Sequence, residues 1–577
     1  MRLTLLICCL ALVAACSGGK PASAPAPVAE ALSLRRVSTG EVIGYASGGA
    51  HAWRAIPFAA PPVGDLRWRA PRPPLAWNGR REAIKPSPWC PQVLSALDGV
   101  DPKRYGEIVG QEDCLFLDIY APAMSAQQAA GARLPVMMWI HGGSNVWGRA
   151  EQYDASALAA RQNVVVVVVQ YRFGFLGWFA HEAIRAGGSL PQDASPNFGT
   201  LDQIRALEWI RDEIGAFGGD AQRVTVFGES AGGHNVAALL VSPLAKGLFH
   251  RAIIQSGSFQ TVSLAKAEGL EGDRPDSARA VAAKLLPGGV TGEKLRALPV
   301  KALFGVYSTK QREFDPPRVI ADGIVLPAEG MLAALANPAT FNSVPVITGT
   351  NRDEARFFNL LQPQLVKRVY GRFLKARDPV FFERLSDYQS RTWRAAAVDE
   401  PADAMVAGGH DKVWAYRFDW DEEGRVFVSH LDELIGAAHS MEIPFVFGRF
   451  THLGALDRFA FTPANAPGRI ALSDAMMSYW AHFAASGEPG QGVDGKQPAW
   501  RPWSKAAADP KLLVLDTDQG GGVRMIADQE SLARIGQELF ADPAVPEERR
   551  CQVFAATKYW NPQLVGAPTG RCPPAGG

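Results

Sequence analysis

The 577-residue chain carries 59 basic and 58 acidic side chains, a formal net charge of +1, and 47% hydrophobic residues. This balance excludes a broad electrostatic attraction to nucleic acid or to acidic membranes, and the hydrophobic fraction excludes intrinsic disorder. The length would allow about four domains at roughly 150 residues each. No polar linker after residue 30 separates such units, so we expect one large folded body.

The first residues are typical of a bacterial lipoprotein signal. Arg2 precedes an uncharged, mostly apolar stretch, residues 3–15, which is too short to span a bilayer but suits the core of a signal peptide. The segment Val13-Ala14-Ala15-Cys16 resembles a lipobox, in which the cysteine is lipidated and becomes the new amino terminus. An ordinary secretory signal with a chance cysteine is the alternative.

Composition also predicts how the rest of the chain is organised. Residues 17–27 are mainly Gly, Ser, Ala and Pro, which suits a flexible tether. We predict a signal peptide over 1–15, a tether over 16–32, and a single domain over 33–577 whose last residues, 545–577, form a tail. The protein would be exported to the periplasm or outer membrane of a bacterium, with membrane contact only through a lipid on Cys16.

The cysteines agree with export. Cys8, Cys9 and Cys16 belong to the predicted signal, which leaves Cys90, Cys114, Cys551 and Cys572. Four cysteines in an oxidising compartment allow three pairings. We predict the two sequence-local pairs, Cys90 with Cys114 and Cys551 with Cys572. No cluster of Cys and His has the close spacing of a zinc site, so we predict no metal.

From about residue 115 onward, apolar runs alternate with helical patterns. The predicted strands are 115–120, 135–140, 164–169, 224–227, 251–255 and 344–348, with a helix over 201–214. This alternation predicts an α/β fold with a mostly parallel sheet covered by helices on both faces. The valines of 164–169 are too few to span a membrane and fit a strand buried on both sides. The stretch from about 261 to 340 would be an inserted or covering region.

Gly228-Glu229-Ser230-Ala231-Gly232 matches the G-x-S-x-G nucleophile elbow. The motif alone is weak because it occurs often by chance. Here it follows the predicted strand 224–227 and precedes a helix-compatible stretch, 233–240, which is the strand–turn–helix setting that the chemistry requires. The flanking glycines leave room for a sharp turn, so Ser230 is the predicted nucleophile.

A second motif, His141-Gly142-Gly143-Ser144, follows the predicted strand 135–140. Sites of this class take backbone N–H donors for a tetrahedral oxyanion from this position. We predict an oxyanion hole formed by Gly143, Ser144 and Ala231. Without the downstream elbow, a Gly-Gly turn after a strand would be only a loop.

Together with these motifs, several further segments resemble the type B carboxylesterase family of α/β hydrolases, which includes bacterial para-nitrobenzyl esterases, animal carboxylesterases and cholinesterases. The segments, in family order, are 54–67, 112–115, 217–220, 255–257 and 479–484. The resemblance covers about residues 40 to 505. It implies an α/β-hydrolase fold with large insertions and a triad of serine, glutamate and histidine in that order.

The resemblance also implies the remaining site residues. The glutamate position is Glu354 and the histidine position is His439, although chemistry alone would not separate Glu354 from the adjacent Asp353. The apolar residues after this histidine, 443–447, resemble a strand. Polar groups implied to support the triad are Glu229, Glu442 and Ser256. Buried ion pairs implied by the family pattern are Arg67 with Glu112 and Arg172 with Asp202.

Two departures from the family bear on the substrate. Ser144 stands where many relatives have glycine or alanine, which narrows the space above the oxyanion hole. The loop 91–113 contains Tyr105 but lacks the tryptophan that the cholinesterase branch uses as a cation-binding face. Specificity for choline esters is therefore not expected.

These motifs predict a serine carboxylic-ester hydrolase that acts through an acyl-enzyme on small, uncharged organic esters, without a cofactor. The near-zero net charge suits a neutral substrate. Acyl transfer to an alcohol or amine would use the same residues and remains an alternative, and a non-catalytic binding protein of the same fold is a third reading. The sequence gives no indication of oligomeric state.

Overall fold

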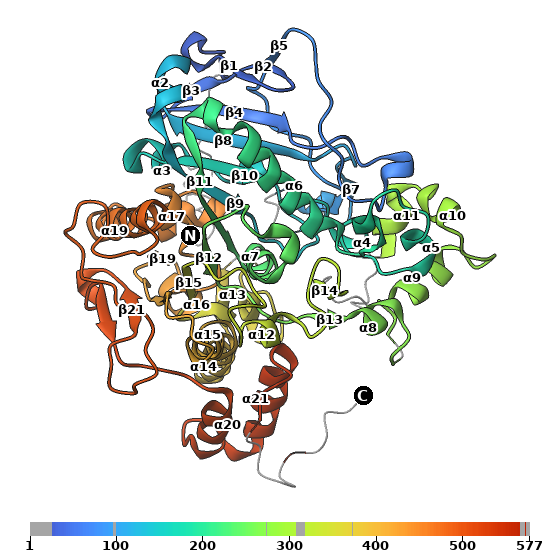
Figure 1. Cartoon of the computed structure of the whole chain (residues 1–577). Coiled ribbons are helices and arrows are strands. Elements are labelled where there is room, and N and C mark those ends of the chain that lie inside the picture. The colour runs from blue at the N-terminus through green and yellow to red at the C-terminus, as the bar shows by residue number, and fades with distance from the viewer. Residues whose placement is uncertain are drawn as a thin grey trace, which may run out of the picture.

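An eleven-stranded sheet runs through the centre of the protein in this computed structural model (Figure 1). The structure describes residues 26–95, 100–272, 274–306, 318–371, 373–565 and 572; the predicted signal peptide and Cys16 lie outside them. The fold begins before residue 33, because Ala29 already forms a β-bridge with Tyr45 and the Glu30 N–H donates to the Gly44 carbonyl. The predicted tether therefore ends earlier than residue 32.

The middle of the sheet is parallel and its edges are antiparallel. In sheet order the strands are β22 (Arg524–Ile526), β21 (Leu512–Leu515), β18 (Val413–Phe418), β15 (Val346–Asn351), β12 (Arg251–Gln255), β11 (Gly219–Glu229), β9 (Leu134–Ile140), β10 (Val165–Val169), β8 (Phe116–Pro122), β4 (Ala50–Pro57) and β3 (Tyr45–Ser47). All pairs from β21 to β10 are parallel. The predicted α/β fold is confirmed, and each predicted strand overlaps an observed one.

Helices cover both faces because side chains alternate along each strand. In β10, Val165, Val167 and Val169 belong to one hydrophobic core, whereas Val166 and Val168 belong to the other. Helices α6 (Phe198–Glu213) and α7 (Ala231–Val241) fill the first core, and α3 (Ser156–Gln162), α17 (Ile443–Phe447) and α19 (Ala466–Ser486) fill the second (Figure 1). No helix in the described part of the chain is long and apolar enough to cross a membrane.

The strand predicted over 443–447 is wrong, because these residues form helix α17. All five side chains are buried, so no polar position reveals the helical period. Pro444 lies in the first turn, where its missing N–H leaves no hydrogen bond unmade. A short, fully apolar run is therefore ambiguous between strand and helix.

The region between β12 and β15 leaves the sheet, as predicted, since these two strands are direct neighbours. Its described elements are β13 (Val262–Ser263), α8 (Leu264–Glu268), α9 (Ala278–Leu285), α10 (Gly292–Arg296), α11 (Val300–Gly305), β14 (Ile320–Ala321) and α12 (Met331–Ala334).

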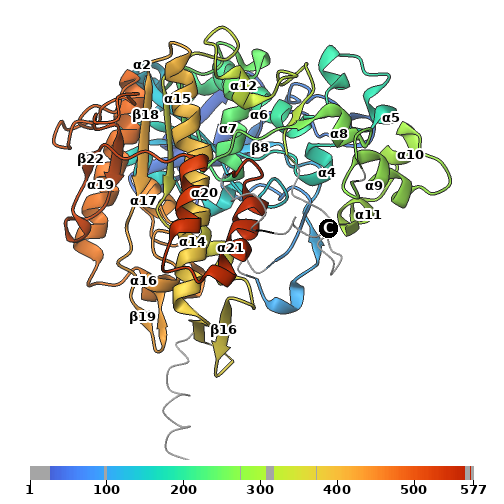
Figure 2. The same ribbon diagram turned by 90° about the horizontal axis from the view of Figure 1, so that it is seen from below.

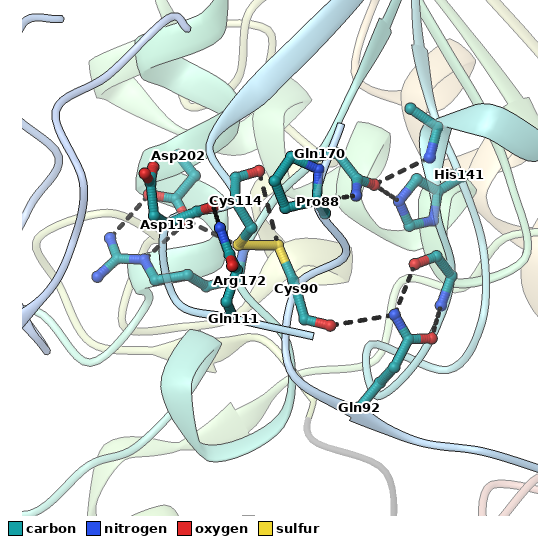
Figure 3. The surroundings of a disulfide bond; sticks show 12 residues. Pro88, Cys90, Gln92, Gln111, Asp113, Cys114, His141, Gln170, Arg172 and Asp202 are labelled. Atoms are coloured by element: carbon teal, nitrogen blue, oxygen red, sulfur yellow. Dashed lines mark hydrogen bonds and ion pairs between the residues drawn. A yellow bond between two sulfur atoms is a disulfide. The ribbon is translucent and has the colours of Figure 1, made fainter. Parts of the chain in front are cut away.

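Both predicted disulfides form. Cys90–Cys114 joins the segment before β6 (Gln92–Val93) to the start of β8 (Figure 3). Cys551–Cys572 lies beside a separate apolar cluster of α14 (Pro379–Arg394), α20 (Leu532–Ala541) and α21 (Glu547–Trp560), which pack side by side in Figures 1 and 2. Residues Glu547–Trp560 of the predicted tail form helix α21.

Two charged pairs that the family pattern implies are present inside the protein. Arg67 Nε lies 2.7 Å from Glu112 Oε2. Arg172 contacts Asp202 through two parallel hydrogen bonds of 2.8 and 2.7 Å, and both side chains are buried. Bidentate geometry of this kind offsets the cost of burying the charges, whereas the loss of one partner would leave the other charge uncompensated.

Candidate active site

Ser230 lies at a sharp turn between β11 and α7, where its backbone has φ 59° and ψ −123°. Such a conformation costs a non-glycine residue about 1–3 kcal/mol and occurs mainly at functional turns. A Cβ on Gly228 would lie 2.5 Å from the Ile140 carbonyl oxygen, and one on Gly232 only 1.9 Å from it. The end of β9 can therefore pack against this turn only if both positions are glycine.

The loop after β9 lies against the same serine. A Cβ on Gly142 would come within 3.0 Å of the Ser230 Cβ. The next residues, Gly143 (φ 104°) and Ser144 (φ 55°), have left-handed backbone conformations. Within the described residues, the N–H groups of Gly143, Ser144 and Ala231 have no hydrogen-bond acceptor. Free N–H groups beside a nucleophile, together with the positive end of α7, suit a developing negative charge.

His439 and Glu354 meet in the interior of the protein. Nδ1 of His439 lies 2.6 Å from Glu354 Oε2, and the two side chains are 4% and 0% exposed. Glu354 begins α13 (Glu354–Leu360), directly after β15, and its Oε1 accepts hydrogen bonds from the Asn351 N–H (2.8 Å) and the Ser256 hydroxyl. A carboxylate held in this way can keep the proton of the imidazole on Nδ1.

Asp353, which the residues alone did not separate from Glu354, faces a different set of partners. Its Oδ2 accepts a hydrogen bond from Arg352 Nη2 at 2.7 Å, and Arg356 Nη2 lies 3.4 Å from its Oδ1. Asp353 is thus occupied by two guanidinium groups, and Glu354 is the carboxylate that contacts His439.

The other ring nitrogen of His439 faces a second carboxyl group. Nε2 lies 3.2 Å from Glu229 Oε1, which also accepts a hydrogen bond from the Ser440 hydroxyl at 2.7 Å. Glu229 directly precedes Ser230, so the His439 ring lies close to the nucleophile. In the described part of the chain, however, no hydrogen bond joins His439 to Ser230. Hydrogen bonds of this type often form fully only when substrate is bound.

Glu442 adds a third buried carboxyl group to this region. Its Oε1 accepts a hydrogen bond from Gln255 Nε2 (3.0 Å), and its Oε2 accepts one from Asn351 Nδ2 (2.7 Å). Asn351 therefore supports two carboxyl groups, because its backbone N–H also donates to Glu354. The structure brings all three predicted supporting residues, Glu229, Glu442 and Ser256, into contact with this network.

Burial and mutual repulsion shift the ionisation of these groups. Burial lowers the pKa of His439, but the carboxylates of Glu229 and Glu354 outweigh it and raise that pKa to about 9. Burial, with the charges of Glu442 and Glu354, raises the pKa of Glu229 to about 8. Burial and the charge of Glu354 also raise the pKa of Glu442. The site therefore favours the imidazolium form of His439.

Aromatic side chains that the sequence did not predict surround the ring of His439. The ring centroids of Trp393, Phe358 and Phe357 lie 4.9, 5.1 and 6.1 Å from that of His439. Phe358 follows Glu354 by four residues on α13, so helical spacing would have placed it on the same face as the carboxylate. Trp393 comes from α14, and no local pattern links it to the site.

Among the described residues, no group of three or more His, Cys, Asp or Glu side chains is arranged to hold a metal ion.

Comparison with known proteins shows the family to which the fold and its sequence are similar. The sequence profile of the carboxylesterase family matches residues 32–402 and 395–531. Para-nitrobenzyl esterase of Bacillus subtilis is 34% identical over 484 residues, covering 78% of this chain and 89% of that protein. Cocaine esterase of Homo sapiens is 33% identical over 542 residues, covering 85% and 89%. A solved para-nitrobenzyl esterase structure superposes with a TM-score of 0.66 at 30% identity, covering 86% and 97%.

Glu354→Gln should lower kcat by about 10³- to 10⁴-fold, because the imidazole loses the carboxylate that fixes its tautomer and stabilises its charged form. Asp353→Asn is the matched control and should keep kcat within about threefold, since Asp353 contacts arginines instead. The measurement is steady-state hydrolysis of a para-nitrophenyl ester by both variants. A larger loss in Asp353→Asn than in Glu354→Gln would contradict the assignment.

Glu229→Gln should shift the pH dependence of kcat/KM to lower pH. Hydrolysis needs the neutral imidazole, so activity rises with pH through the raised pKa of His439. Removing the Glu229 carboxylate removes a charge that favours the imidazolium, so the pKa of His439 should fall. The ratio of kcat/KM at low pH to kcat/KM at high pH should therefore rise about three- to tenfold. Glu433→Gln, an exposed carboxylate, is the control. An unchanged profile in Glu229→Gln would refute the coupling.

Proposed function

The chain belongs to the carboxylesterase family and is a carboxylic ester hydrolase, and from this premise we propose that Ser230, His439 and Glu354 carry out the reaction through an acyl-enzyme. The observation that carries the proposal is the 2.6 Å contact between His439 Nδ1 and Glu354 Oε2 beside the strained turn that holds Ser230. The carboxylate Glu354, the base His439 and the nucleophile Ser230 come from three separate segments of the chain that the sheet brings together.

In the first half-reaction, Nε2 of His439 takes the hydroxyl proton of Ser230 as Oγ bonds to the ester carbonyl carbon. The carbonyl π electrons move to oxygen, and the N–H groups of Gly143, Ser144 and Ala231 stabilise the resulting oxyanion. When the oxyanion collapses, the bond to the alcohol oxygen breaks and His439 returns its proton to that oxygen. The alcohol leaves, and the acyl group stays on Ser230.

In the second half-reaction, a water molecule replaces the alcohol. His439 removes a proton from the water as its oxygen bonds to the acyl carbon, and the same N–H groups hold the second oxyanion. Collapse releases the carboxylic acid, and His439 returns the proton to Ser230. Glu354 stabilises the imidazolium that forms in each half-reaction.

The surroundings of His439 support small, uncharged esters as substrates. Trp393, Phe358 and Phe357 provide apolar surface next to the base. An ester that packs against these rings gains from the removal of apolar area from water. The net charge of +1 provides no strong field that would select ionic substrates.

We also propose that the protein is exported and held at a bacterial membrane by a lipid on Cys16, and that it has a single catalytic domain, which begins near Ala29 and not at the predicted residue 33. The lipobox-like sequence and the composition of the tether support the anchor. The two disulfides fit an oxidising compartment. The continuous sheet from β3 to β22 supports one domain.

Ser230→Ala should lower kcat/KM by about 10⁴- to 10⁶-fold on every ester that the parent hydrolyses, because the hydroxyl that forms the acyl-enzyme is lost. The measurement is a panel of para-nitrophenyl esters from acetate to long-chain and aromatic acids. Ser242→Ala is the control, since Ser242 is a buried serine at the end of the same helix with no hydrogen bond from its hydroxyl. Parent-like rates in Ser230→Ala would sink the proposal.

Cys16→Ser should release the protein from membranes, since the acceptor of the lipid is lost. The measurement is the fraction of the full-length chain that sediments with membranes in a bacterial host. Cys9→Ser, inside the signal peptide, is the matched control and should remain membrane-bound. Continued sedimentation of Cys16→Ser would defeat the lipid anchor without affecting the catalytic proposal.

A further inference from the structure

The loop that carries two of the oxyanion donors has an unusual backbone. Gly143, Ser144 and Asn145 have φ values of 104°, 55° and 58°, and Gly148 follows at 131°. Side chains disfavour this left-handed region, and two of these residues have side chains. The loop therefore needs partners elsewhere in the protein to hold its shape.

The first half of the loop is held by α7 and by the residues that follow β10. Asn145 Oδ1 accepts a hydrogen bond from Asn235 Nδ2 of α7 at 2.9 Å, and the Asn145 carbonyl accepts the Gly174 N–H at 2.7 Å. The His141 carbonyl accepts the Tyr171 hydroxyl at 2.6 Å. These contacts fix where the loop leaves β9, but they do not reach its far end at Gly148.

Gln92 holds that far end through a pair of hydrogen bonds (Figure 3). Its Oε1 accepts the Gly148 N–H and its Nε2 donates to the Gly148 carbonyl, each at 3.1 Å. The second proton of Nε2 is donated to the Cys90 carbonyl, also at 3.1 Å. The side chain is completely buried. Its amide thus binds both the backbone N–H and the backbone carbonyl of Gly148 and connects them to the Cys90 carbonyl.

The segment that carries Gln92 is itself fixed. Cys90, two residues earlier, forms the disulfide to Cys114 at the start of β8, and Gln92 pairs with Val109 in a short antiparallel ladder. Figure 3 shows the disulfide next to Gln92, with the Gln92 amide joined to the Cys90 carbonyl. The disulfide and the ladder therefore fix the Gln92 amide relative to the central sheet, independently of the loop that the amide binds.

The fixed end at Gly148 is linked to the donors by a tight turn. The Gly143 carbonyl accepts the N–H groups of Val146 and Trp147 at 3.0 and 3.1 Å. A Cβ on Gly143 would lie 2.0 Å from the Trp147 carbonyl oxygen. Gly143 and Trp147 are thus in direct contact, and Gly148 is the next residue.

From this chain of contacts we propose that Gln92 is a positioning residue that sets the direction of the Gly143 and Ser144 N–H groups toward the oxyanion. Gln92 touches no reacting atom and acts only through the loop. The inference rests on the proposed role of these two N–H groups in the hydrolysis, and it predicts that loss of the Gln92 amide weakens binding of the oxyanion more than binding of the neutral ester.

The test uses Gln92→Met, which keeps the length and volume of the side chain but makes neither hydrogen bond. We expect kcat for para-nitrophenyl acetate to fall about 10- to 100-fold with KM within about twofold, since misplaced donors act only in the transition state. Gln92→Asn, whose amide is one methylene too short to reach Gly148, should show the same split and serves as the second variant if Gln92→Met does not fold.

A pair of inhibitors separates positioning from general damage. An alkyl trifluoromethyl ketone adds the serine hydroxyl to its carbonyl and places an oxyanion in the hole, whereas the matching methyl ketone binds mainly as the neutral ketone. The trifluoromethyl ketone should bind more weakly in Gln92→Met by the same factor as the fall in kcat, and the methyl ketone should bind as in the parent. Equal weakening of both ketones would overturn the proposal.

Gln389→Met is the matched control. Gln389 is also buried and makes two hydrogen bonds, with Asn359 and with the Ala556 carbonyl, away from the oxyanion loop. It should lose thermal stability comparably and keep its kcat and both inhibitor affinities. If Ser230→Ala is inactive but Gln92→Met behaves like Gln389→Met, the positioning role alone is overturned. If Ser230→Ala keeps the parent rate, the proposed function itself fails.

Discussion

The buried hydrogen bond between His439 and Glu354 is the interaction on which the site depends. A carboxylate removed from water is stable only if each of its oxygens is satisfied. The Asn351 N–H and the Ser256 hydroxyl meet this requirement on Oε1, while His439 occupies Oε2. These partners come from the carboxyl ends of β15 and β12, so the parallel order of the sheet is what makes the burial of this charge possible.

The same low-dielectric setting couples the three carboxyl groups around one imidazole. Burial, with repulsion from neighbouring carboxylates, raises the pKa values of Glu229 and Glu442, whereas the carboxylates of Glu229 and Glu354 outweigh burial and raise the pKa of His439. Hydrogen bonds from Ser440 to Glu229 and from Gln255 to Glu442 partly compensate this repulsion. A base that must become positively charged in each half-reaction is thereby surrounded by groups that stabilise that charge.

Two residues that support the site, Gln92 at the oxyanion loop and Trp393 at His439, lie on elements whose positions are set far from the reacting atoms. The disulfide at Cys90 fixes the segment from which Gln92 reaches the oxyanion loop. On the other side of the site, α14 carries Trp393 against His439 and packs against α20 and α21, and Cys551 of α21 forms the disulfide to Cys572. Each disulfide thus stabilises a segment that is in contact with the site, either directly through Gln92 or through the packing of α21 against α14.

Features that depend on local chain geometry could be predicted from the sequence. The elbow at Ser230, the glycine loop after β9, the parallel strands and both cysteine pairs follow from short motifs, side-chain period and spacing, all of which are visible along the chain. The choice of Glu354 over Asp353 needed the family pattern. Three other features became evident only in the tertiary structure. Residues 443–447 form a helix and not a strand, and Trp393 contacts His439. Gln92 binds Gly148, which lies 56 residues away in the chain. Such contacts depend on how buried side chains meet across the fold, and no periodicity along the chain encodes them.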